Sequence, residues 1–221
     1  MLQKARLLPI YLLTVLSCVR CSNDSVVLTD TYQKPPKQDT LIIIESDTVY
    51  VDLQVSKSDY ERYVDTLKTY LGAREVNASN RGPLIDLFFN DCGEPPMAPG
   101  NPYCACFANY GLVSIGLNGP KCAAWSPCWF PDDKVVWRRG VDPNYMTFQT
   151  GWTFGLYYSR LGRVGHVGVV VQDFGDGYVL TIEGNTNSAG SREGHGVFMR
   201  LRHKDEIHIC SDWVKSNPNS R

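Results

Sequence analysis

The chain has 221 residues, of which 43% are hydrophobic and 20% charged, and its formal net charge is -1. This length and composition fit a globular protein with one good core and an appendage. The sequence contains no basic run and no alternation of basic and aromatic residues, which argues against a nucleic acid partner.

The N-terminus has the pattern of an export signal. A short positive region precedes the apolar run Leu7–Leu16, which is too short to span a bilayer. The stretch Val15-Leu16-Ser17-Cys18 resembles a bacterial lipobox, in which the cysteine is lipidated and becomes the first mature residue. An ordinary cleaved secretory signal is the alternative. With either leader, residues 1–21, the mature protein is exported to the cell envelope, as a periplasmic protein or one anchored in the membrane through lipidated Cys18.

Residues 22–57 predict a linker followed by an accessory strand segment. The first part, residues 22–39, is polar, contains the pair Pro35-Pro36 and has few large apolar residues, which is typical of a flexible spacer. The segment Leu41–Val55 then alternates apolar and polar residues with the period of a strand. It predicts either a separate hairpin or a strand added to the main sheet.

The pattern then changes to that of helices. Ser58 and Glu61 have the spacing of a capping box, and Gly72 suits the end of the helix that they begin. A second, short helix is predicted over Leu84–Asn90, and a third from Tyr103 to about Leu117.

Cys104 lies where a turn becomes the third helix. Gly100-Asn101-Pro102 form the turn, so the thiol belongs to the first helical turn. Unpaired N–H groups and the helix dipole favour an anion there, and such positions lower a thiol pKa from about 8.5 to roughly 3.5–7.5. Cys104 is therefore a candidate nucleophile, provided that the chain also supplies a base. A small buried hydrophobic residue is the alternative interpretation.

The other cysteines are candidates for disulfides. An oxidising compartment permits such bonds, and Cys122 and Cys128 could close a small loop. Cys106 points roughly opposite to Cys104 on a helix, which favours core packing or a disulfide over catalysis. No CxxC pair and no His-x-x-x-His pattern accompanies Cys122 and Cys128, so no metal or other cofactor is predicted. Six cysteines follow the leader: Cys92, Cys104, Cys106, Cys122, Cys128 and Cys210.

Residues 118–150 show no dominant period and are rich in turns and large aromatic residues. Such a loop can line a groove beside an active site, or it can fold on a small core of its own, and both interpretations stay open. The candidate substrate-binding residues are Tyr103, Trp125, Trp129 and Trp152.

The C-terminal part has the composition of strands. Val164–Gln172, Tyr178–Glu183 and Gly196–Leu201 predict an antiparallel meander, and residues 206–221 a charged tail. Helices followed by strands is the order typical of an α+β fold, in which helices cover one side of a sheet.

Histidine is the usual general base near neutral pH, and the chain has four. His166 lies in Gly165-His166-Val167-Gly168 at the start of a predicted strand, where small neighbours are expected to leave its ring accessible. His203 and His208 lie in a charged segment and His195 in a Gly-rich loop. His166 is therefore the preferred base.

The predicted hairpin also supplies residues to orient His166. If the chain turns at the centre of Phe174–Gly177, Asn185 faces His166, and Glu183 lies two residues away on the same face. Both could hold the imidazole in one tautomer, as the third member of a triad does. A register error of one residue would place them on the opposite face.

Three blocks of sequence carry a family resemblance. Pro102-Tyr103-Cys104-Ala105, Gly165-His166-Val167-Gly168 and Glu183-Gly184-Asn185 resemble the signatures of the CHAP family of cysteine, histidine-dependent amidohydrolases and peptidases, within the papain-like NlpC/P60 group. The resemblance runs from about Ser58 to Leu201, covers most of the mature chain, and implies a catalytic domain over residues 58–205. It implies a papain-like fold, with N-terminal helices packed on an antiparallel sheet and the nucleophile at a helix N-terminus. It also implies hydrolysis of amide bonds in peptidoglycan.

By this resemblance Cys104 would attack the carbonyl, His166 would take and return the proton, and Glu183 with Asn185 would orient His166. N–H groups at the start of the cysteine helix would hold the oxyanion. The neighbouring Cys106 and the Trp- and Cys-rich loop depart from the family pattern and leave the substrate open. A cysteine peptidase or amidase with a non-wall substrate, and a catalytically inert envelope-binding lipoprotein, are the competing functions.

Overall fold

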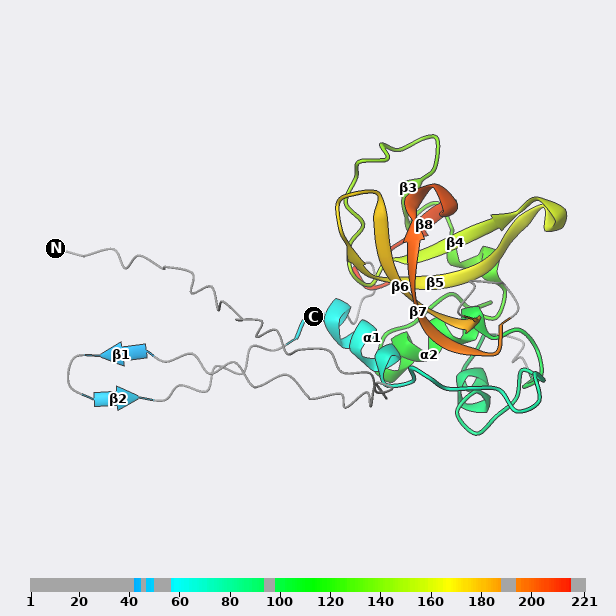
Figure 1. Ribbon diagram of the computed structural model, residues 1–221, viewed down its shortest axis with the longest axis horizontal. Helices are drawn as coiled ribbons and strands as arrows, with labels where there is room; N and C mark the ends of the chain where they lie inside the picture. The colour runs from blue at the N-terminus through cyan, green and yellow to red at the C-terminus, as the bar shows by residue number, and fades with distance from the viewer. Residues whose placement is uncertain (1–41, 45–46, 50–56, 94–97, 188–193, 216–221) are drawn as a thin grey trace, which may run out of the picture. The chain divides into compact units, whose positions relative to one another are not determined.

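The computed structural model describes residues 42–44, 47–49, 57–93, 98–187 and 194–215 (Figure 1). The chain forms two compact units, Met1–Gln54 and Val55–Arg221. The predicted leader with its lipid anchor at Cys18, and the predicted spacer, lie outside the described residues. No helix in the described ranges is both long enough and apolar enough to cross a membrane.

The first unit contains a small hairpin. Strands β1 (Ile42–Ile44) and β2 (Asp47–Val49) pair antiparallel and make a two-stranded sheet of their own. Of the two interpretations of this segment, the separate hairpin is therefore the one confirmed.

The second unit begins with helix α1, Asp59–Lys68, which starts at the predicted capping box. The Ser58 side chain accepts a hydrogen bond from the Glu61 backbone, and the Glu61 carboxylate accepts one from the Ser58 backbone. The helix ends before the predicted stop at Gly72. The predicted second helix is a single 3₁₀ turn, η1, Asp86–Phe89.

Helix α2, Cys104–Ser114, is the central element of this unit, and most of its residues are buried. Two glycines let its neighbours approach closely. A Cβ at Gly111 would lie 2.6 Å from the side chain of Leu67 on α1, and one at Gly184 would lie 2.8 Å from Phe107. Helix α2 therefore fills the space between α1 and the sheet, and Figure 1 shows both helices beneath the sheet.

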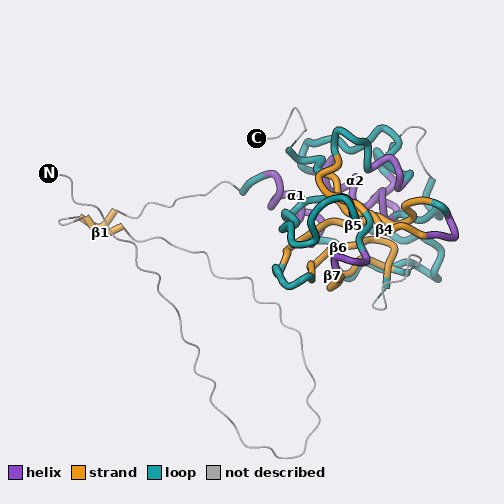
Figure 2. The backbone as a smooth tube through the Cα atoms, turned by 90° about the horizontal axis from the view of Figure 1, so that it is seen from above, coloured by secondary structure: helices purple, strands orange, loops and turns teal. Residues whose placement is uncertain are grey.

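The sheet has six antiparallel strands in the order β3-β8-β4-β5-β6-β7. Strands β5, β6 and β7 form the predicted meander, whereas β3, β4 and β8 were not predicted. Figure 2 shows β4 to β7 from above. The bounds are β3 Val135–Arg138, β4 Thr153–Tyr158, β5 Arg163–Asp173, β6 Tyr178–Thr186, β7 Gly196–His203 and β8 Ile209–Ser211. Short 3₁₀ turns are η2 Ser126–Trp129, η3 Ser159–Leu161 and η4 Lys204–Glu206.

Strand β8 corrects the prediction of a tail over residues 206–221. It lies between β3 and β4, where Cys210 pairs with both Trp137 and Phe154, and all three of its residues are buried. A strand of three residues is too short to show a period, so its existence depends on partners far away in the sequence. The domain therefore continues past residue 205, the predicted boundary.

The described part of the chain has two disulfides, one that closes a small loop and one that ties a loop to helix α2. Cys122 bonds to Cys128, which confirms the predicted small loop, and Cys92 bonds to Cys106. The prediction that Cys106 serves packing or a disulfide is therefore also confirmed. Within the described part of the chain the free cysteines are Cys104 and Cys210, both of them buried.

The hydrophobic core has two parts. The larger one joins α1, α2 and η1 to β5 and β6, with Phe88 and Phe107 near its centre. The smaller one gathers side chains of β3, β4 and β8 around Trp137 and Phe154. The start of α2 and the adjoining strand β5 carry the residues of the candidate site.

Candidate active site

Cys104 is the first residue of α2 and lines a cavity of about 230 Å³. Its residue surface is 4% exposed, so the thiol is shielded from bulk water but adjoins an open space. The cavity is formed by the turn before α2, the loop that enters η2 and the start of β5. Its lining residues are Asn101, Pro102, Cys104, Ala124, Trp125, Ser126, Arg163 and Gly165.

His166 lies on β5 and is held by Glu183 on β6. The ring nitrogen Nε2 is 2.8 Å from Glu183 Oε2, and both side chains are fully buried. The nearest backbone pair of β5 and β6, Val169 with Ile182, has the register that was predicted to bring these residues together. The predicted contact between His166 and Glu183 is therefore present in the structure.

Asn185 makes no hydrogen bond to the imidazole. Its φ is 54°, and the pairing of β6 with β7 shifts between Glu183 and Thr186. Both polar atoms of its side-chain amide are buried without a hydrogen-bond partner. The irregular backbone explains the difference, because the predicted contact assumed that β6 continues as a regular strand.

Gly168, two residues after His166, makes room for other side chains rather than for solvent. The ring of His166 is fully buried, which corrects the expectation that it would be accessible. A Cβ at Gly168 would lie 2.6 Å from the ring of Phe154 and 2.7 Å from Cγ of Glu183. Gly168 therefore leaves the space in which Glu183 reaches the imidazole.

Arg202 and Thr181 donate hydrogen bonds to the carboxylate of Glu183. Arg202 donates from Nε to Oε1 at 2.5 Å and from Nη2 to Oε2 at 2.7 Å. The Thr181 hydroxyl donates to Oε1 at 2.7 Å. Each carboxylate oxygen thus accepts two hydrogen bonds, counting the one from His166, and the carboxylate is fixed in one orientation.

Arg202 and Thr181 were not among the site residues predicted from the sequence. Thr181 pairs with Arg200 on β7, so Arg202 lies on the same face two residues further along that strand. The alternation of Arg200 and Arg202 was the available signal, but the predicted strand ended at Leu201.

The environment of Cys104 stabilises its thiolate. Burial raises the pKa of the thiol, but the positive charge of His166 and the polar environment that His166, the Val167 backbone and Ser126 provide lower it overall. Ser126, on η2, is a further site residue that the sequence analysis missed.

The same contact favours the charged form of His166. Burial lowers the pKa of the imidazole, but the negative charge of Cys104 and the hydrogen bond and charge of Glu183 raise it from 6.5 to about 9. Because Nε2 is bonded to Glu183, Nδ1 is the nitrogen left to exchange a proton with the thiol. The two shifts together favour a thiolate at Cys104 and an imidazolium at His166.

Glu183 remains ionised in this buried place. Burial raises the pKa of its carboxyl, but the hydrogen bonds from Arg202 and His166, together with their charges, lower it from 4.5 to about 2. The carboxylate can therefore hold the proton of His166 on Nε2, as the third member of a triad does.

The start of α2 leaves N–H groups for an anion. No side chain in the described ranges caps this helix, and its first backbone bond runs from Phe107 to Tyr103. The N–H groups before Phe107 therefore have no partner within the helix, and they lie next to the Cys104 thiol.

One of the four predicted substrate-binding residues lines the cavity. Trp125 does so and is 49% exposed. Trp129 is fully buried, and its indole donates to the Ala123 carbonyl. Tyr103 is also fully buried, and Trp152 lies in the smaller core. Of these four residues, only Trp125 is placed to touch a substrate. The other three predictions are wrong because a sequence pattern does not separate aromatic residues of the core from those that line a cavity.

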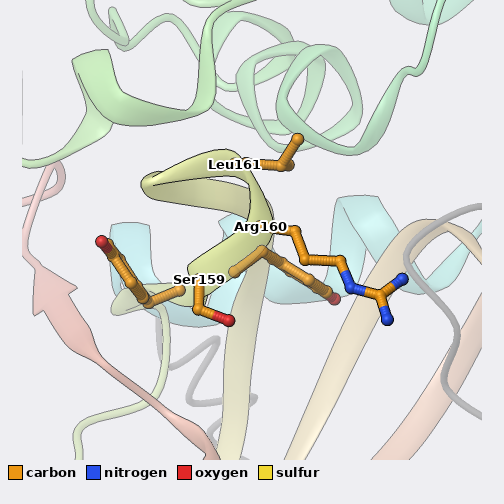
Figure 3. Close-up of a pocket in the computed structure, with 5 residues that line it drawn as sticks. Ser159, Arg160 and Leu161 are labelled. Carbon is orange, nitrogen blue, oxygen red and sulfur yellow. The ribbon is translucent and has the colours of Figure 1, made fainter.

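A larger hollow of about 510 Å³ lies at the turn between β4 and β5, and it lacks the groups for this chemistry. Five consecutive residues, Tyr157 to Leu161, line it, and Figure 3 shows Arg160 and Leu161 leaving the turn in different directions. Ser159 there has no histidine or carboxylate among the lining residues to activate it. Nowhere in the described ranges do three His, Cys, Asp or Glu side chains gather as a metal site.

Comparisons with known proteins give little further information. No family model matches the chain, and no curated protein matches it. Among solved structures, it is similar to a P60 domain of an antigen from M. avium subspecies paratuberculosis, with a TM-score of 0.39 and 14% sequence identity. That alignment covers 71% of this chain and 95% of the other. The interpretation of the site therefore depends on its own geometry.

Proposed function

We propose that the protein is a cysteine hydrolase that cleaves amide bonds. One arrangement carries this proposal. Cys104 lines a cavity, His166 lowers the pKa of its thiol, and the fixed carboxylate of Glu183 bonds to the other side of the imidazole. A buried cysteine that served only packing would need neither a cationic neighbour nor a cavity.

The residues supply each step of acyl transfer. The Cys104 thiolate attacks the carbonyl carbon, a C–S bond forms, and the carbonyl oxygen becomes an oxyanion near the free N–H groups of α2. His166 then gives its Nδ1 proton to the leaving amine as the C–N bond breaks. In the second half His166 takes a proton from water, which attacks the thioester and releases Cys104. Glu183 keeps the other proton on Nε2 throughout.

We infer that the substrate is peptidoglycan and that the protein acts in the cell envelope. The three sequence blocks that resemble the CHAP family support this substrate, and the predicted export leader, with lipidation at Cys18 in one of its two forms, supports this location. The two disulfides fit an oxidising compartment outside the cytoplasm.

Release of soluble fragments from isolated cell walls tests the enzyme and its substrate together. The purified protein should release such fragments, and Cys104→Ala should abolish the release. Cys210→Ala is the matched control, because Cys210 is the other free cysteine of the described chain and lies in the smaller core. Undiminished release by Cys104→Ala would contradict the proposal.

Two measurements separate the competing functions. Cleavage of a peptide panel without any release from cell walls would favour a peptidase or amidase with another substrate. The pH dependence of Cys104 alkylation by iodoacetamide distinguishes an enzyme from an inert lipoprotein. We expect stoichiometric labelling at pH 6, because the thiol pKa is lowered and the His166 pKa is about 9, whereas an ordinary thiol with a pKa of about 8.5 is barely ionised there.

A further inference from the structure

A cation stacked on an aromatic ring lies in the same cavity as the nucleophile. The guanidinium carbon of Arg163 is 3.9 Å from the centre of the Trp125 ring, and both side chains line the cavity of Cys104. Arg163 begins β5, three residues before His166, so the strand that carries the proposed base also positions this cation.

Arg163 has hydrogen-bonding capacity to spare. Its one side-chain hydrogen bond runs from Nη1 to the Val164 carbonyl at 2.9 Å, and in the described ranges no carboxylate lies within ion-pair distance of it. Arg81 and Arg138, by contrast, pair with Asp86 and Asp132. A guanidinium has five N–H donors, so the donors opposite Nη1 remain for a ligand.

The cavity around this cation has the character of a site for a single negative charge. None of its lining residues is acidic, and the only ionisable side chains among them are those of Cys104 and Arg163. Stacking on Trp125 holds the guanidinium plane, and a planar fork of donors matches the two oxygens of a carboxylate. The 49% exposed indole leaves an apolar surface beside that fork.

We propose that Arg163 and Trp125 form a carboxylate-binding subsite, which selects substrates with a free carboxylate close to the amide that Cys104 attacks. This inference rests on the proposed function and names the chemical class of its substrate: an acidic peptide amide. Trp125 contacts the hydrocarbon part of the acidic residue, and Arg163 pairs with its carboxylate.

Alkylation of Cys104 measures this subsite without a known substrate. Iodoacetate and iodoacetamide react alike, in that the thiolate forms a C–S bond to the methylene carbon and iodide leaves, but only iodoacetate carries a carboxylate. The ratio of their rates therefore reports the attraction of the cavity for a carboxylate. We expect Arg163→Met to lower this ratio about fivefold, the effect of losing one partly exposed charge pair.

Two further variants control the measurement. Arg163→Lys keeps the charge without the planar fork and should give an intermediate ratio. Arg160→Met removes a nearby cation at the β4–β5 turn, outside the cavity, and should leave the ratio as in the unmodified protein. A ratio that is the same in Arg163→Met and Arg160→Met would overturn the subsite.

Turnover of paired peptides extends the test to substrates. The pair consists of one stem peptide with a free glutamyl α-carboxylate and the same peptide with that group amidated. The unmodified protein should prefer the acid, and Arg163→Met should lose most of that preference through a higher KM. If Cys104 resists both alkylating reagents, the proposed function fails and the subsite with it. If it reacts but neither preference depends on Arg163, only the subsite fails.

Discussion

Arg202→Met removes both hydrogen bonds from the guanidinium to Glu183 while keeping most of the side-chain volume. The carboxylate then stays buried with only His166 and Thr181 as partners. The ionised form of Glu183 is favoured by the difference between a pKa of 4.5 and one of about 2. At 1.36 kcal/mol for each pKa unit, this amounts to about 3 kcal/mol. Arg202 heads the contacts that lower this pKa, with His166 next, and breaking a buried ion pair costs about 3–5 kcal/mol, so we expect the free energy of unfolding at pH 7 to fall by about 3 kcal/mol.

The pH dependence of this loss follows from its cause. Because the pKa of Glu183 is lower in the folded protein, its ionisation stabilises the fold fully above pH 4.5, and this contribution is lost as the pH falls through about 2. Between pH 7 and pH 3 the contribution shrinks by about 2 kcal/mol. Urea unfolding of both proteins at these two pH values should therefore show a much smaller difference at pH 3.

Glu206→Gln is the matched control for Arg202→Met. Glu206 contacts Arg202 Nη1 at 3.0 Å, but its side chain is 51% exposed, so we expect its substitution to cost less than about 1 kcal/mol. Arg202→Met should also slow Cys104 alkylation at pH 6, because a Glu183 carboxylate that Arg202 no longer orients holds the imidazolium less well. An Arg202→Met protein as stable as Glu206→Gln, or one whose loss is the same at both pH values, would refute the reasoning.

Two other substitutions test the architecture of the site. Gly168→Ala should lower the free energy of unfolding by about 1–3 kcal/mol and slow Cys104 alkylation, since the new methyl group displaces Glu183; unchanged urea unfolding would show that the space is not needed. Replacing Cys92 and Cys106 together by alanine should cost about 3 kcal/mol in the same assay. Cys104 should still be labelled at pH 6 in that protein, and loss of labelling would indicate a chemical role for Cys106.

The contact between His166 and Glu183 was predicted correctly, but the prediction holds partly because two departures from the assumed register compensate each other. Near the turn Asp173 pairs with Val179, one residue out of step with the predicted pairing. The register then shifts between Val170 and Gln172, which restores the predicted alignment before His166. Without this bulge Glu183 would lie on the opposite face from the imidazole.

The elements that the sequence analysis missed depend on distant partners. Strand β4 lies between β5 and β8, but its sequence TFGLYY is nearly all apolar and aromatic and shows no alternation. In the sequence, Arg202 and Arg163 look like ordinary surface arginines. Only the fold shows that Arg202 contacts Glu183 and that Arg163 lies over the ring of Trp125. By contrast, the capping box and the start of α2 were predictable because their signals are local.

The bond between Cys92 and Cys106 sets a requirement on how the chain oxidises. Cys106 is 14 residues from Cys92, and Cys104 is two residues nearer. The free-energy costs of closing a loop from Cys92 to Cys106 and one from Cys92 to Cys104 therefore differ by only about 0.1 kcal/mol. Loop closure in the unfolded chain thus barely favours either bond, although a bond from Cys92 to Cys104 would block the proposed nucleophile. The formation of helix α2 decides which cysteine bonds to Cys92. Side chains two residues apart on a helix point about 200° apart, so only Cys106 faces Cys92. Folding of α2 must therefore precede the first oxidation, or a thiol–disulfide isomerase must correct it.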